Sequence, residues 1–148
     1  MSRHTARIHV MNLIFQLPFH PEWGEDGGLF SAASEEYLAG LSDLGEHLRG
    51  VNPNEADSAF IRGECGGVFG NLAEIDAVID ARLKDWELGR LARIDLALLR
   101  LAVYEIRYAE DITDATAINE AIELAKVYGT DESAAFINGV LGQVSRDG

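Results

Sequence analysis

The most apolar part of the chain is segment 93–106, where hydrophobic residues fall on more than one side of a helix. At helical spacing, one side carries Ile94, Leu98, Leu101 and Ala102, and another carries Leu99, Val103 and Ile106. A helix that is apolar around most of its circumference is covered by neighbours on most sides. The pattern therefore predicts the central helix of a helical bundle.

Three charged residues interrupt this apolar helix, namely Asp95, Arg100 and Glu105. A charge on a buried helix is costly unless it is paired. Each of the three therefore needs a partner, either inside the bundle or on another molecule. For each one taken alone we expect internal pairing, because charged side chains are rarely buried without a partner.

Apolar residues spaced by three and four predict two helices earlier in the chain, at 2–17 and 29–49. Pro18 and Pro21 end the first helix, and Gly50 ends the second. Asn52 as N-cap and Pro53 at the first helical position begin a third helical region. This region extends up to Trp86, either as one helix or as two with a kink.

Four glycines, Gly63, Gly66, Gly67 and Gly70, lie in this third region. In a helix interior, each glycine lowers the stability of the helix by about 1 kcal/mol relative to alanine. Two explanations stay open, and we favour close approach of another helix over a break near Gly70. These four glycines form a glycine stripe. Together with apolar surface that is exposed when no partner is bound, the glycine stripe could form the interface of a homodimer of the free chain.

Two further helices follow the central one and a polar turn at 111–114. The first, at 117–126, has a core face of Ile118, Ala121, Ile122 and Ala125, and Gly129 ends it. Thr130 or Asp131 caps the last helix, whose inner face is Phe136 or Ile137, Val140, Leu141 and Val144. We expect an all-α fold, a compact bundle of six or seven helices without a sheet, forming a single domain over residues 1–148.

The composition of the chain limits the classes of function that it can have. One cysteine, Cys65, and no long apolar run or signal-peptide pattern fit a protein of the reducing cytoplasm that is not in a membrane. The net charge of −13 argues against broad, nonspecific nucleic-acid binding. The sequence has no phosphate loop, nucleophile elbow or metal-ligand spacing, so we expect no enzyme activity, no cofactor and no metal.

The first turns of the first helix are basic, with Arg3, His4 and Arg7. Positive side chains there oppose the helix dipole by about 0.3–1 kcal/mol each. Arg3 and Arg7 share one face and would form a cationic claw at the end of the core, suited to phosphate oxygens and stacked bases. The alternative is a pair of surface arginines that bridge to acidic neighbours.

Several segments together resemble the NusB family of transcription antitermination factors. They are Arg93-Ile94-Asp95, Leu99-Arg100-Leu101-Ala102 and Tyr104-Glu105 in the central helix, AINEAIELAK at 117–126 and FINGVL at 136–141. Trp86-Glu87-Leu88 with Arg90-Leu91 is similar to the middle of the family, and the basic start and Leu13-Ile14-Phe15 add a weaker likeness. The resemblance covers nearly the whole chain. It implies an all-helical fold of two packed halves, binding to the boxA RNA of ribosomal RNA operon transcripts, and a heterodimer with the ribosomal protein NusE that joins the RNA polymerase antitermination complex.

Site residues follow from the resemblance by position. The basic start, Arg3, His4 and Arg7, would contact RNA, and the turn before the last helix adds Glu132 and Ser133. The NusE face would include Phe15 and Asp95, which gives Asp95 a basic partner. Family members are usually more basic at the start, so we expect the basic partner to supply much of the charge that faces RNA.

Two other functions stay open. One is a protein–protein adapter of the transcription complex that does not bind RNA. The other is a stand-alone NusB-like module of an RNA cytosine methyltransferase, which would need a large additional catalytic domain with a cofactor site and a reactive cysteine.

Overall fold

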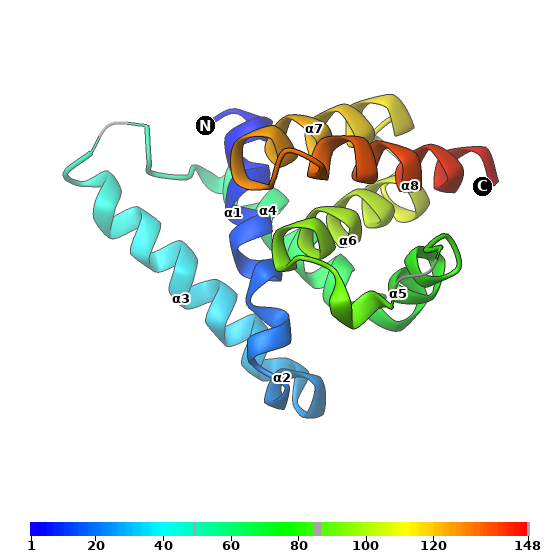
Figure 1. Ribbon diagram of the computed structural model, residues 1–148. Helices are drawn as coiled ribbons and strands as arrows, with labels where there is room; N and C mark the ends of the chain where they lie inside the picture. The colour runs from blue at the N-terminus through cyan, green and yellow to red at the C-terminus, as the bar shows by residue number, and fades with distance from the viewer. Residues whose placement is uncertain (49, 85–86, 148) are drawn as a thin grey trace. The chain divides into compact units, whose positions relative to one another are not determined.

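The computed structural model describes residues 1–48, 50–84 and 87–147 (Figure 1). Within these ranges every regular element is a helix, which confirms the all-α class, with eight α-helices rather than six or seven. The α-helices are α1 Arg3–Phe15, α2 Glu22–Glu25, α3 Gly27–Gly45, α4 Glu55–Gly70, α5 Leu72–Asp80, α6 Arg93–Tyr108, α7 Asp114–Tyr128 and α8 Ser133–Asp147. Two short 3₁₀ helices are η1 Leu17–Phe19 and η2 Leu88–Arg90.

The chain divides into two compact units, Met1–Phe69 and Gly70–Gly148. In the first unit, α1 buries an apolar arc of Ala6, Val10, Leu13 and Ile14, and Leu17 follows it in η1. Ser2 caps α1, because its hydroxyl accepts the Thr5 backbone N–H at 3.0 Å. The helix α1 ends at Phe15, two residues before the predicted Leu17. The chain then forms the short 3₁₀ helix η1, which contains Pro18.

The starts of α3 and α4 are fixed by caps that hydrophobic spacing did not reveal. Asp26 accepts the Gly28 N–H at 3.0 Å, so α3 begins at Gly27 rather than Leu29. Asn52 is not the N-cap of α4. That role belongs to Asn54, whose side-chain oxygen accepts the Asp57 N–H at 2.8 Å while the Asp57 carboxylate accepts the Asn54 N–H at 2.9 Å. This reciprocal pair is a capping box.

The third helical region is two helices, because α4 ends at Gly70 and α5 begins at Leu72. The favoured close approach to the glycine stripe is wrong for Gly63, Gly66 and Gly70, since a Cβ added at any of them would meet nothing within 4 Å. The alternative, a break near Gly70, is what the structure shows. The predicted ends of this region and of the preceding helix, Trp86 and Arg49, lie outside the described residues.

In the second unit, α7 and α8 pack on each other and on α6, and α5 also packs on α6 (Figure 1). Residues 95–103 of α6 are buried without interruption, which confirms the predicted central helix. The inner face of α8 contains Ile137 rather than Phe136. The prediction for the core face of α7 was partly wrong. Ile118 and Ile122 are half-buried, and the buried face consists of Ala117, Ala121, Leu124 and Ala125.

The charge of Arg100 is paired inside the second unit, as expected. Its guanidinium donates two hydrogen bonds to the Asp76 carboxylate, from Nε to Oδ1 at 2.8 Å and from Nη2 to Oδ2 at 2.9 Å. Such a two-point pair ties α6 to α5. Across the described residues, the helices are too short or too polar to span a bilayer.

Candidate nucleic-acid interface and partner pocket

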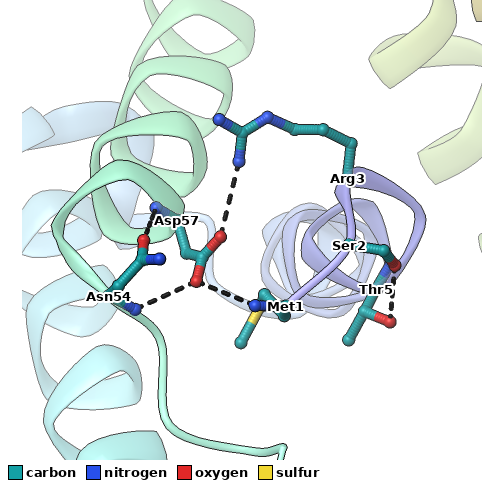
Figure 2. Close-up of polar contacts among 6 residues, drawn as sticks. All are labelled: Met1, Ser2, Arg3, Thr5, Asn54 and Asp57. Atoms are coloured by element: carbon teal, nitrogen blue, oxygen red, sulfur yellow. Dashed lines mark hydrogen bonds and ion pairs between the residues drawn. The ribbon is translucent and has the colours of Figure 1, made fainter.

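The basic start of α1 lies beside the first turn of α4, where Asp57 collects several donors (Figure 2). Nη1 of Arg3 lies 3.5 Å from Oδ1 of Asp57, and the Met1 amine lies 3.1 Å from Oδ2. The pKa of the Asp57 carboxyl lies below its ordinary value, chiefly because the Asn54 N–H bonds to it, with the amine and Arg3 adding to the effect. A deprotonated Asp57 therefore anchors the basic start.

Arg3 and Arg7 both lie over the ring of Phe60, with their guanidinium carbons 4.7 and 5.4 Å from its centroid. Such cation–π contact keeps a guanidinium close to an apolar surface. The two arginines differ in exposure, because the Arg3 side chain is 49% exposed whereas Arg7 is only 4% exposed. The expected claw of two overhanging arginines is therefore wrong for Arg7, while Arg3 reaches the surface and bridges to an acidic neighbour. His4 is half-buried.

The second unit contains a hollow of about 400 Å³, lined by Arg90, Leu91, Ala92, Asp95, Glu132 and Phe136. Asp95 is 9% exposed, and within the part of the chain that the structure describes its Oδ1 has no hydrogen-bond partner. A buried acceptor without a partner costs about 1–3 kcal/mol, and more when it is charged. Of the three charges on the central helix, Asp95 is thus the one with an oxygen free for another molecule.

The turn before α8 supplies Glu132 to this hollow. Glu132 is exposed, and its Oε2 accepts the Thr130 hydroxyl at 3.2 Å. Ser133 is 1% exposed, and its hydroxyl accepts the Thr130 backbone N–H at 2.9 Å. Of the two predicted residues in this turn, Glu132 is therefore the one presented to solvent, while Ser133 holds the turn together.

The remaining predicted residue, Phe15, is half-buried at the end of α1, with its ring 5.6 Å from that of Phe19. Phe19 is 57% exposed, so an aromatic surface does continue beyond Phe15. Sequence reasoning missed Asp57 and Phe60 at the basic start. The Asn-x-x-Asp spacing of the capping box could have revealed Asp57, whereas nothing in the local pattern marked Phe60.

The described residues contain neither a metal-binding cluster nor a reactive cysteine thiol. Among the described residues no group of three His, Cys, Asp or Glu side chains is placed to hold a metal ion. Burial raises the pKa of the Cys65 thiol to about 12, with a smaller contribution from Glu64, so the thiol is not a nucleophile at neutral pH.

An all-helical protein with a basic helix start and an acidic hollow has the features of a protein that binds charged partners. The sequence matches the NusB family over residues 4–146, and the chain belongs to that family. It is 38% identical to the transcription antitermination protein NusB of Agathobacter rectalis, over 97% of this chain and 98% of that one. The family places the chain among transcription antitermination factors, not among enzymes.

Solved structures agree with this assignment. The fold superposes on T. maritima NusB with a TM-score of 0.81 at 32% identity, covering 99% of this chain and 92% of the other. It also superposes on a chain from a structure of the antitermination factors NusB and NusE in complex with dsRNA, with a TM-score of 0.73 at 21% identity and full coverage of both chains. The second likeness is one of fold.

Proposed function

We propose that this chain binds boxA RNA of ribosomal RNA operon transcripts as a heterodimer with NusE, and that the heterodimer acts in the cytoplasm within the RNA polymerase antitermination complex. Membership of the NusB family supports this proposal, as does the likeness in fold to a chain from a structure of NusB and NusE in complex with dsRNA. The observation that carries it is the Asp95 carboxylate, almost buried and with one oxygen unpartnered among the described residues.

Asp95 supports the partner half of the proposal. A carboxylate that has no internal donor for one oxygen is compensated when a basic group from another protein reaches it. NusE is the basic companion that the family resemblance implies. In the first unit, Phe15 is half-buried beside the exposed ring of Phe19 and is the proposed apolar contact for NusE.

Arg3 and His4 support the RNA half. The Arg3 guanidinium is half-exposed over Phe60, where it can pair with a phosphate while the ring limits its movement. The buried Arg7 lies over the same ring and supports the position of Phe60. Because the whole chain carries a net charge of −13, we expect the RNA affinity of the free chain to be low.

Titration of boxA RNA with the free chain and with its NusE heterodimer tests the proposal. We expect the heterodimer to bind much more tightly, because NusE contributes basic surface. Equal affinity of the two would contradict the role proposed for NusE in RNA binding.

The contribution of Arg3 is tested by comparing Arg3→Ala with Arg62→Ala in the heterodimer. The two arginines are matched, because their side chains are 49% and 52% exposed and each is paired with a carboxylate of the first unit. Arg3→Ala should weaken boxA binding and reduce the salt-dependence slope by roughly 0.7, the value for one phosphate contact on a single strand. Arg62→Ala should leave both unchanged.

The burial of Arg7 and the pairing of Arg3 with Asp57 favour a second candidate, an adapter that joins NusE to the transcription complex without touching RNA. In that case Arg3→Ala would change neither RNA affinity nor salt dependence, while NusE binding would be retained. The same titration therefore separates the two candidates.

A further inference from the structure

Two carboxylates from separate elements line one hollow of the second unit. Asp95 comes from the first turn of α6, and Glu132 comes from the turn that precedes α8. The family resemblance implied different partners for them, NusE for Asp95 and RNA for Glu132. Their shared hollow, of about 400 Å³, indicates that one ligand meets both.

The rest of the lining defines what that ligand is. Leu91, Ala92 and Phe136 form apolar walls, which suit the methylene stem of a long side chain, and the Phe136 ring also attracts a cation. The lining includes one basic residue, Arg90, whose side chain is 75% exposed and lies 4.0 Å from the Glu87 carboxylate. Arg90 therefore points largely to solvent, and an inserted side chain meets a predominantly acidic, apolar-walled site.

We propose that this hollow takes one basic side chain of the partner protein, an arginine by preference, which pairs with both Asp95 and Glu132. A guanidinium carries five N–H donors in a planar fork, so it can bond two carboxylates at once, while its stem lies along Leu91 and Phe136. Glu132 is then a partner-binding residue. This inference rests on the proposed function, in which the second unit binds NusE.

Charge argues against RNA as the occupant. A phosphate placed beside two carboxylates is repelled by both, and the repulsion is strong where the site is poorly hydrated. The one RNA group that suits a carboxylate is the amino group of a base, such as that of cytosine. That alternative makes Glu132 an RNA contact and is distinguished by the test below.

The test measures NusE affinity without RNA, by calorimetry, for Glu132→Gln, Asp95→Asn and the matched control Asp131→Asn. Asp131 is the neighbouring exposed carboxylate and does not line the hollow. We expect Asp95→Asn to weaken NusE binding by about thirtyfold or more, and Glu132→Gln by about three- to tenfold, because the second carboxylate is more exposed. Asp131→Asn should change the affinity by less than about twofold.

Two further measurements separate the outcomes. When boxA RNA is titrated into heterodimer kept saturated with NusE, Glu132→Gln should bind as the unsubstituted chain does. In a scan of NusE arginines and lysines to methionine, a single NusE position should show coupling with both Asp95 and Glu132 in double-mutant cycles. Circular dichroism melting shows that each variant is folded.

The inference is overturned if Glu132→Gln leaves NusE affinity unchanged, or if it weakens RNA binding by the saturated heterodimer. An effect of Asp95→Asn alone would remove the role of Glu132 and leave the proposed function intact. If neither substitution affects NusE binding, the proposed partner surface itself is wrong.

Discussion

Replacing Arg100 by methionine should destabilise the protein by about 2–3 kcal/mol. The Arg100 and Asp76 side chains are 9% and 23% exposed, and two hydrogen bonds join them. Breaking a fully buried pair costs about 3–5 kcal/mol, because the remaining charge is left uncompensated. We lower this figure because Asp76 stays in partial contact with water, which screens the charge left behind. For a chain of 148 residues, the loss corresponds to a fall in melting temperature of roughly 5–10 °C.

The assay is urea unfolding at neutral pH followed by circular dichroism, applied to Arg100→Met, Asp76→Leu and the double variant. The double variant should regain most of the loss, because no unpaired charge remains. The matched control is Arg62→Met, which breaks the exposed two-point pair with Glu35 and should cost much less stability than Arg100→Met, because water screens an exposed pair. Equal losses for Arg100→Met and Arg62→Met, or additive single effects, would refute the argument from burial.

Three other substitutions and probes test the remaining contacts. The lowered pKa of Asp57 means that its contribution to stability is present above about pH 4 and is lost as the pH falls further, so the loss caused by Asp57→Ala should shrink in acid urea titrations. Cys65, whose thiol pKa is about 12, should react with a disulfide reagent only when urea unfolds the chain. Gly45→Ala should lower the melting temperature, because the added Cβ would overlap Asn52 and lie 2.8 Å from its Cα.

Local pattern predicted the parts of the fold that depend on one helix at a time. The arc of α1 and the nearly complete burial of α6 follow from spacing, because a helix sets which side chains share a face. Helix ends were less accurate. Asn52 and Asn54 offer the same capping chemistry two residues apart, and only the reciprocal bond with Asp57 selects Asn54.

The candidate site was likewise predictable from the sequence only in part. The basic start, and the need of Asp95 for a partner, were visible in the sequence because charges at a helix start or on an apolar helix conflict with local stability. Which charge finds its partner inside the chain was not visible, because Arg100 and Asp76 are 24 residues apart. The burial of Arg7 and the shared hollow of Asp95 and Glu132 also depend on contacts between separate elements.

The sequence by itself determined that the chain is all-helical, that its most apolar helix is central and that it belongs to a family of binding proteins rather than enzymes. Periodicity and motif order carry that information within short stretches. Only the tertiary structure decided that Arg3 reaches solvent while Arg7 does not, and that an oxygen of Asp95 is left unpartnered among the described residues. Exposure and pairing are properties of how helices pack, and residues distant in sequence set them.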